Sequence, residues 1–165
     1  MSEAVIGFGS NLGEKNANLL RALQAVSRLP GVQVTGISSI YESSPVEAPG
    51  AQEDYHNMCV KVDVSMSPMA LLGACLGIEA ALGRVRAARN AARVIDLDLL
   101  LYEGVKSESF ELSLPHPRLL QRAFVLLPLK ELYPSGRAPG IFFEPYIKEV
   151  DGSGVRKLEQ RIAME

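Results

Sequence analysis

The sequence predicts an α+β fold with an antiparallel sheet. Short apolar runs and amphipathic stretches alternate in the order strand, helix, strand, strand, helix, strand up to Tyr102. Stop signals follow both helices, Pro30 and Gly31 after the first and Gly83 after the second. This order is the split βαββαβ unit of ferredoxin-like cores, with both helices on one face. Short helices and a small extra strand pair, including residues 141–143, are expected after it.

The first half of the chain supplies three of these strands and one helix. Residues 4–8 are an apolar run, and the glycine-rich turn at residues 9–13 leads into a helix over residues 15–29. The apolar stripe of this helix consists of Leu19, Leu20, Leu23, Val26 and Leu29. Strands are expected over residues 32–41 and 58–64. The long loop between them, residues 42–54, is of a length that usually indicates function or disorder.

The second helix is predicted over residues 67–82, because Ser67 is a typical N-cap and Pro68 suits the first helical position. Its candidate core residues are Met69, Leu72, Leu76 and Leu82. Glu79 interrupts an otherwise apolar run one turn before Arg84. It is either a surface carboxylate or a polar contact beside the arginine-rich segment that follows.

Two aspartates on the last core strand are the strongest chemical signal. Asp96 and Asp98 are two positions apart, so they share one face of a strand and lie about 6.6 Å apart along the backbone. Such a pair can bind one Mg²⁺ ion, or two ions that bridge a polyphosphate, while arginines in residues 84–93 neutralise phosphate charge. The opposite face is expected to be core and carries Ile95, Leu97, Leu99 and Leu101. Alternatively, the aspartates are the solvated side of a half-buried strand and the arginines a solvated loop.

Other polar residues lie where strands and turns end. Tyr55 and Asn57 stand at the mouth of the third strand, where an amide suits the edge of a heterocycle, although a capped turn with a packed tyrosine explains them equally. His116 lies in a proline-rich turn near Arg118 and Arg122, and is either structural or a hydrogen-bond donor to a phosphate or ribose.

Composition narrows the functional class. The chain has 165 residues, enough for one domain, with 47% hydrophobic residues, 22% charged residues and a net charge of −2. This charge does not indicate nucleic-acid or membrane partners. Cys59 and Cys75 lie in apolar runs without close spacing, so they are expected to be buried thiols. No signal peptide or apolar span of about 18 residues is visible, and a cytoplasmic protein is expected. The glycine spacing does not fit a dinucleotide fingerprint, and no P-loop occurs.

Several segments, taken together and in order, resemble the 6-hydroxymethyl-7,8-dihydropterin pyrophosphokinases of the folate pathway. The matching segments are residues 9–13 (GSNLG), 39–45 (SIYESSP), 54–57 (DYHN), 83–86 (GRVR), 93–98 (RVIDLD), 115–116 (PH) and 122–124 (RAF), with Glu79 leading into the fourth. The resemblance covers about residues 4–134 of a single domain spanning residues 1–165. Differences are the absence of the family's usual loop Trp, Pro117 after the histidine, and Ser43-Ser44-Pro45 in place of Thr-x-Pro.

The resemblance implies transfer of the β,γ-pyrophosphoryl unit of ATP to the pterin hydroxymethyl oxygen, releasing AMP. It implies two Mg²⁺ ions on Asp96 and Asp98, with Arg84 and Arg93 joining these aspartates in catalysis. It places ATP against Glu79, Arg84, Arg86, Arg93, Leu99, His116 and Arg122. It places the pterin against Gly9, Ser44, Val46, Tyr55, Asn57 and Phe124. No His or Glu is an evident general base, so Asp98 or a metal-bound hydroxyl is expected to fill that role.

Two other classes of function remain open at this point. One is a ferredoxin-like module that binds a nucleotide or single-stranded nucleic acid without chemistry, although the five Phe and five Tyr are scattered. The other is a metal-dependent phosphohydrolase that uses the same aspartates. Acceptor-dependent AMP release separates the three. A monomer is expected, with loops at residues 42–56 and 84–93 closing over the bound substrates, and no chemistry is assigned to residues 135–165.

Overall fold

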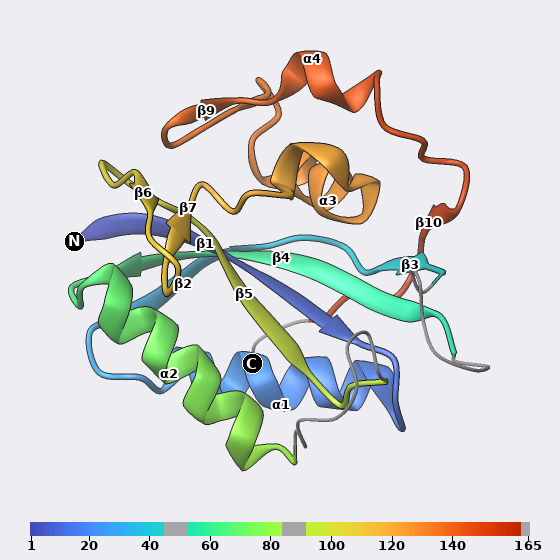
Figure 1. The fold of residues 1–165 in the computed structure, drawn as a ribbon. Helices are drawn as coiled ribbons and strands as arrows, with labels where there is room; N and C mark the ends of the chain where they lie inside the picture. Colours follow the sequence, from blue (N-terminus) through green and yellow to red (C-terminus); the bar gives the residue numbers. More distant parts are fainter. Residues whose placement is uncertain (45–52, 84–91, 163–165) are drawn as a thin grey trace.

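The main sheet is antiparallel and has the strand order β10-β3-β4-β1-β5, with β2 also paired to β4 (Figure 1). A computed structural model describes residues 1–44, 53–83 and 92–162. The core elements are β1 (Ser2–Ser10), α1 (Lys15–Ser27), β2 (Val32–Ile37), β3 (Tyr41–Ser43), β4 (Tyr55–Val64), α2 (Pro68–Ala81) and β5 (Asp96–Tyr102). The predicted βαββαβ order is confirmed. Among the described residues, no helix is both long and apolar enough to cross a membrane.

The C-terminal part adds short elements around this core. They are β6 (Ser107–Glu108), β7 (Ser113–Leu114), a 3-10 turn (Leu119–Gln121), α3 (Ala123–Leu132), β8 (Arg137–Ala138), β9 (Ile141–Phe142), α4 (Glu144–Ile147) and β10 (Val155–Lys157). The small strand expected near residues 141–143 is β9, which pairs with β8. β10 was not predicted, because its three residues have no distinctive pattern and its partner β3 is distant in sequence.

The second strand differs from the prediction, because the expected strand over residues 32–41 is divided. β2 pairs with one end of β4, and β3 pairs with the other end. Between them, the buried Ser38 side chain accepts a hydrogen bond from the backbone N–H of Cys59 at 2.9 Å. A side-chain oxygen therefore replaces a regular backbone partner at this point.

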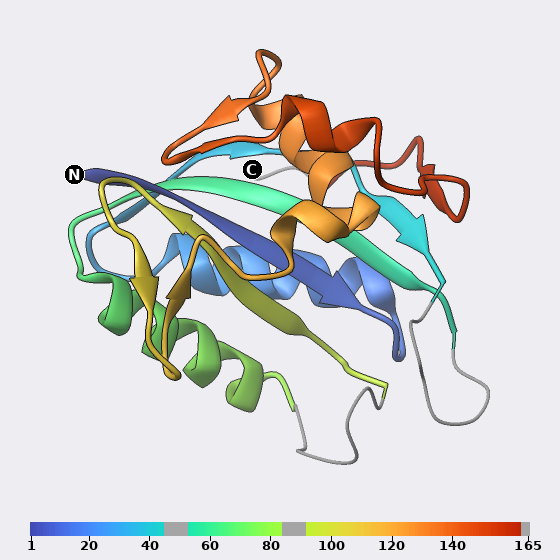
Figure 2. The same ribbon diagram turned by 45° about the horizontal axis from the view of Figure 1, so that its top comes forward.

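The sheet is covered on both faces. α1 and α2 lie on one face, as predicted, and α3 lies on the other face with α4 beyond it (Figures 1 and 2). The core beneath α1 and α2 includes Ile6, Leu23 and Val60, while the core beneath α3 includes Leu100 and Leu126. Because α3 covers the second face, a layer of side chains lies between the sheet and this helix. The cavity described below lies in this layer.

Two predictions about the core are wrong in part. Met69 and Leu76 of α2 are exposed by 52% and 43%, and the helix instead buries Leu71, Cys75 and Ile78. Because α2 is apolar around most of its circumference, its sequence does not define which side packs inward.

The second error concerns β5. A register shift between β1 and β5 places Leu101 in the cluster beneath α3, while Ile95, Leu97 and Leu99 lie in the cluster beneath α1 and α2 as predicted. A bulge of this kind reverses the side-chain alternation beyond it. Asp96 and Asp98 precede the shift, so they still share one face. Both cysteines of the chain are buried free thiols, as predicted.

Candidate active site

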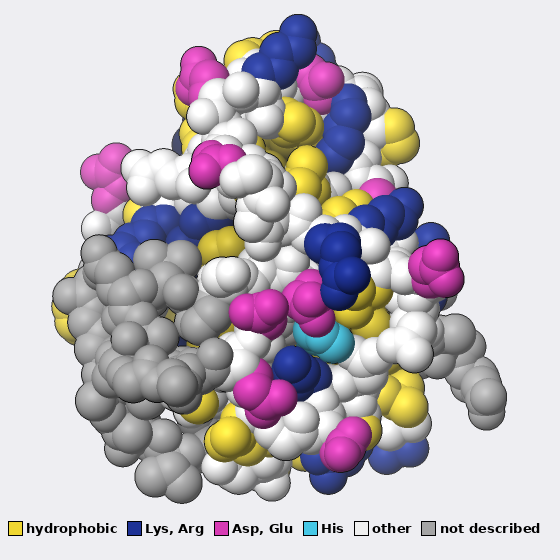
Figure 3. All heavy atoms as spheres, turned by 90° about the vertical axis from the view of Figure 1, so that its right-hand side faces the viewer, with side chains coloured by type: hydrophobic (Ala, Val, Ile, Leu, Met, Phe, Trp, Pro, Cys, Tyr) yellow, Lys and Arg dark blue, Asp and Glu magenta, His cyan; other side chains and the backbone are white. Residues whose placement is uncertain are grey.

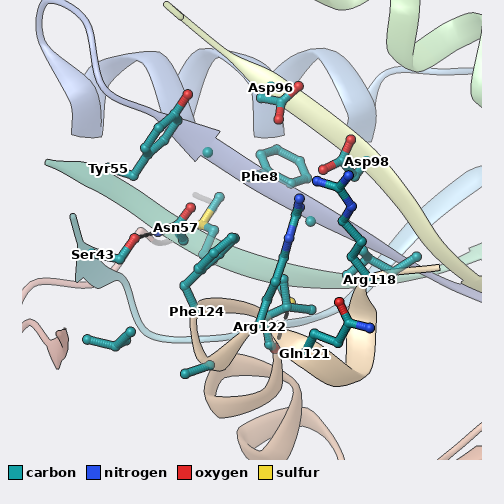
Figure 4. A pocket seen from close by; sticks show the side chains of 18 of the residues that line it. Phe8, Ser43, Tyr55, Asn57, Asp96, Asp98, Arg118, Gln121, Arg122 and Phe124 are labelled. Carbon is teal, nitrogen blue, oxygen red and sulfur yellow. Dashed lines mark hydrogen bonds between the residues drawn. The ribbon is translucent and has the colours of Figure 1, made fainter. Parts of the chain in front are cut away.

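A cavity of about 760 Å³ lies between the start of α3 and the face of the sheet that this helix covers (Figure 4). The strands contribute small and polar residues to its walls, whereas the 3-10 turn and α3 contribute cations and an aromatic ring. Its lining includes Gly7, Gly9, Ser43, Ser44, Tyr55, Asn57, Arg93, Asp96, Asp98, Arg118, Gln121, Arg122 and Phe124. Five of the six residues expected to contact a pterin are in this list, and the sixth, Val46, lies outside the described residues.

The strand register explains why these side chains converge. Gly9 on the central strand β1 lies opposite Asn57 on β4 and opposite Asp96 on β5. Directly opposed residues project to the same face, so Asn57 and Asp96 share a face and their backbones are two strand spacings apart, about 9.6 Å. Asp98 lies opposite Gly7 on the same face. Glycines at both central positions leave the floor of the cavity open between the amide and the carboxylates.

A side chain at Gly9 would crowd this floor. A Cβ atom at this position would lie 3.1 Å from Asn57 Oδ1 and 3.5 Å from Tyr55 Cδ1. Asn57 is oriented in turn by Ser43, whose Oγ accepts a hydrogen bond from Asn57 Nδ2 at 2.8 Å. In Figure 4, Asn57 lies between the rings of Tyr55 and Phe124. The arrangement suits a flat heterocycle whose edge is read by the amide and whose faces contact the rings.

A second cavity, of about 330 Å³, lies on the far side of the aspartates, between β5, α2 and the β6–β7 hairpin. Glu79, Leu99 and His116 line it, as three of the residues expected to contact ATP. Arg93, Asp96 and Asp98 line both cavities. The carboxylate pair therefore stands at the boundary between two binding spaces.

The acidic and basic groups at this boundary lie close together. Burial, together with the nearby carboxylate of Asp96, raises the pKa of Asp98 well above the usual aspartate range. Arg93 Nη1 lies 3.0 Å from Asp96 Oδ1. A divalent cation would relieve the repulsion between the carboxylates. Mg²⁺ usually binds one or two protein carboxylates and completes its coordination shell with phosphates and water. The two carboxylates at this boundary fit that preference.

Within residues 1–44, 53–83 and 92–162, no cluster of three or more His, Cys, Asp or Glu side chains could hold a metal on its own.

The chain is similar to proteins of one known family. Residues 5–134 match the family model described as 7,8-dihydro-6-hydroxymethylpterin-pyrophosphokinase. The chain belongs to this family. A Methylorubrum extorquens relative named 2-amino-4-hydroxy-6-hydroxymethyldihydropteridine pyrophosphokinase is 40% identical over 159 residues, which cover 96% of this chain and all of that protein. A Bacillus subtilis protein of the same name is 36% identical over 98% of this chain and 93% of its own length.

Solved structures support the fold of the family. One titled as an HPPK-DHPS in complex with substrates has a TM-score of 0.68 and 12% identity, covering 90% of this chain. The wild-type HPPK-DHPS of Plasmodium falciparum has a TM-score of 0.67 and 13% identity. This chain spans about 45% and 44% of those two chains, respectively. Family membership makes this chain an enzyme, a pyrophosphokinase of folate biosynthesis.

In this pyrophosphokinase, Glu79 is a buried carboxylate on α2, not a surface group. It is 2% exposed, and its Oε2 accepts a hydrogen bond from the backbone N–H of Leu97 at 2.7 Å. Because Leu97 stands between Asp96 and Asp98, this bond fixes the segment that presents both aspartates. The surface alternative for Glu79 is therefore wrong, and its partner Leu97 was not predicted.

His116 has a defined hydrogen-bonding direction. Its Nδ1 accepts from the backbone N–H of Arg118 at 3.3 Å, so the neutral ring carries its proton on Nε2. Burial and the positive charge of Arg122 lower the pKa of His116, which favours this neutral form. The ring can therefore donate a hydrogen bond into the second cavity, which it lines.

The structure adds residues that sequence reasoning did not assign to the site. Arg118 and Gln121 line the first cavity, and Figure 4 shows the Arg118 guanidinium directed toward Asp98. Arg122, which was expected to contact ATP, lines the first cavity and is not part of the lining of the second. Its Cζ lies 5.5 Å from the centroid of the Phe124 ring, so the cation stacks on an aromatic wall.

The C-terminal segment also reaches this cavity, through Asp151, Gly154 and Val155. No local motif marks these residues, and their proximity depends on the pairing of β10 with β3. Two predicted phosphate ligands, Arg84 and Arg86, lie outside the described residues, as does most of each loop expected to close.

Proposed function

We propose that this enzyme transfers the pyrophosphoryl group of ATP to the hydroxymethyl oxygen of 6-hydroxymethyl-7,8-dihydropterin. ATP occupies the second cavity with its phosphates directed toward Asp96 and Asp98, and the pterin occupies the first cavity. The observation that carries this proposal is the shared boundary, because Arg93, Asp96 and Asp98 line both cavities. A group transferred between two substrates must cross such a boundary.

The reaction joins the acceptor oxygen to the β-phosphorus of ATP and breaks the bond between that phosphorus and the α,β-bridging oxygen. The bridging oxygen leaves with AMP, and the acceptor hydroxyl loses its proton. Mg²⁺ on Asp96 and Asp98, in two ions as the family resemblance implies, would offset the negative charge that collects on the leaving oxygen.

Residues of the chain orient the two substrates. Asn57, Tyr55 and Phe124 hold the pterin so that its hydroxymethyl group points along the floor toward Asp98. Arg93 and Arg122 contact phosphate oxygens, and His116 donates from Nε2 on the nucleotide side. Asp98 accepts the hydroxyl proton, because it lines both cavities and so stands between the two substrates. The proposal also includes an active monomer.

Acceptor-dependent AMP release tests the proposal. Purified enzyme with Mg²⁺ and ATP should release AMP only when the hydroxymethyl-dihydropterin is added, and chelation of the metal should stop the reaction. Asn57→Ala should raise KM for the pterin, and His116→Ala should raise KM for ATP. Phosphate or AMP release without the acceptor would favour a phosphohydrolase instead. Full turnover by Asp98→Asn would rule out Asp98 as the base.

A further inference from the structure

The C-terminal strap, defined as residues 151–162, follows the part of the chain that matches the family model. It leaves the layer above α3 and runs along β3 as β10 (Figure 1). The backbone N–H of Leu158 donates to the carbonyl of Ile40 at 2.8 Å. The Leu158 and Ile162 side chains pack against the core beneath α1 and α2. The strap is thus bonded to the body of the protein along its length.

A continuous chain of polar contacts begins and ends on this strap. Arg156 Nη2 donates to Glu42 Oε1 at 2.8 Å, and Glu42 Oε2 lies 3.0 Å from His56 Nε2. His56 Nδ1 lies 2.7 Å from Asn16 Oδ1, and Asn16 Nδ2 donates to Gln160 Oε1 at 2.8 Å. Figure 3 shows the side of the molecule on which β3 and β10 lie, where acidic and basic side chains stand close together. The strap, β3, β4 and the start of α1 are therefore joined by one network.

The network lies next to the first cavity, but its side chains are not part of the cavity lining. Glu42 is followed by Ser43, and His56 stands between Tyr55 and Asn57, so successive side chains alternate between network and cavity. On the other edge of β3, Val155 of the strap lies directly opposite Ser43. Ser43 in turn orients Asn57 through its 2.8 Å hydrogen bond.

The strand that carries Ser43 needs such support. β3 has three residues, and it pairs with β4 on one side and with β10 on the other. A strand this short has little stability of its own, so its position depends on its neighbours. Removing the contacts made by the strap would therefore loosen Ser43 before it disturbs β4 or β5.

We propose that the strap is a positioning element for the acceptor. Arg156 and Gln160, acting through Glu42 and His56, hold Ser43 and Asn57 in the geometry that receives the pterin, while Gly154 and Val155 close the wall of the cavity. This inference rests on the proposed function, because it takes the first cavity as the pterin site. Its consequence is that the strap determines affinity for the pterin and leaves affinity for ATP unchanged.

Binding measurements on the full-length chain test the proposal. Glu42→Ala removes both contacts of the central carboxylate, and Arg156→Ala removes the ion pair to the strap. Pterin affinity is measured by calorimetry at saturating Mg²⁺ and a non-hydrolysable ATP analogue, and the affinity for that analogue is measured separately. Arg137→Ala is the matched control, because Arg137 is exposed on the β8–β9 hairpin and stacks on Phe142, 4.1 Å from its ring centroid.

We expect Glu42→Ala to weaken pterin binding about tenfold and Arg156→Ala about threefold, in line with partly exposed ion pairs. The ATP analogue should bind as it does to the native enzyme, and Arg137→Ala should change neither affinity. The inference is overturned if Glu42→Ala leaves pterin affinity within about twofold of native, or if it weakens both ligands equally, as a purely structural role would.

A further variant separates failure of this inference from failure of the proposed function. Asn57→Ala should weaken pterin binding, because Asn57 lines the first cavity itself. If Asn57→Ala has no effect, the first cavity is not the pterin site and the proposed function fails in that respect. If Asn57→Ala weakens binding and Glu42→Ala does not, the positioning role of the strap alone is wrong.

Discussion

The carboxylate of Glu79 on α2 accepts a 2.7 Å hydrogen bond from the backbone N–H of Leu97 on β5. The bond reaches the strand between Asp96 and Asp98, and Glu79 is almost completely buried. It therefore connects a helix of the core to the point from which both carboxylates project.

Removal of this acceptor should destabilise the protein. Glu79→Ala leaves the buried Leu97 N–H unpaired and should lower the free energy of unfolding by about 1–3 kcal/mol. Glu79→Gln keeps a side-chain oxygen that can accept the same hydrogen bond, so its free energy of unfolding should be closer to that of the native protein. Urea denaturation of the three proteins checks this order. Equal losses for both variants would show that the charge of Glu79, and not its bond to Leu97, matters.

Arg93 and Asp96 form an ion pair at the position where a metal would bind, with 3.0 Å between Nη1 and Oδ1. Mg²⁺ and Arg93 should therefore compete for Asp96. Arg93→Gln should bind Mg²⁺ more tightly than the native protein without nucleotide, by a few-fold, because a partly exposed pair is worth about 1 kcal/mol or less. Turnover should nevertheless fall at least about tenfold, since a phosphate contact is lost. Calorimetry and AMP release measure the two effects, and weaker Mg²⁺ binding by the variant would contradict the competition.

Gly9→Ala should act on the acceptor and not on ATP. The new Cβ atom would lie 3.1 Å from Asn57 Oδ1, so the amide must shift from its position on the cavity floor. A shift of this size should weaken pterin binding about tenfold, the loss expected for one displaced hydrogen bond. Gly77→Ala is the matched control, because a Cβ atom there meets nothing within 4 Å. This change within α2 should stabilise the protein slightly. Equal pterin affinity in the two variants would contradict the placement of Gly9 on the floor of the pterin site.

The raised pKa of Asp98 predicts the pH dependence of stability without metal. Burial and the charge of Asp96 raise this pKa in the folded state, so the folded protein binds a proton that the unfolded chain has already released. The resulting stabilisation is complete below the ordinary aspartate pKa and is lost as pH rises through the raised value. In thermal melts with a chelator, Tm should therefore fall between about pH 4 and pH 8. Asp98→Asn should reduce this fall, and saturating Mg²⁺ should reverse it. An unchanged pH profile in Asp98→Asn would contradict the assignment.

Local patterns in the sequence were sufficient to predict the order of the core helices and strands. Period-2 and period-3.6 apolar patterns, together with the stop signals at Gly31 and Gly83, predicted the βαββαβ order. The alternation of Asp96 and Asp98 with Leu97 predicted that the two carboxylates share a face. These features depend on residues within a few positions of one another, which is the range over which local periodicity carries information.

The tertiary structure decided which distant residues meet. The register of β1 set Gly9 between Asn57 and Asp96, and a bulge moved Leu101 to the opposite face from Leu97. The pairing of β10 with β3 brought Val155 into the wall of the cavity. Register and strand pairing depend on contacts between segments far apart in sequence. These contacts contribute free energy only once the chain has folded. Local sequence patterns therefore determined which chemical groups each strand and turn carries, and the tertiary structure decided which of these groups face one another.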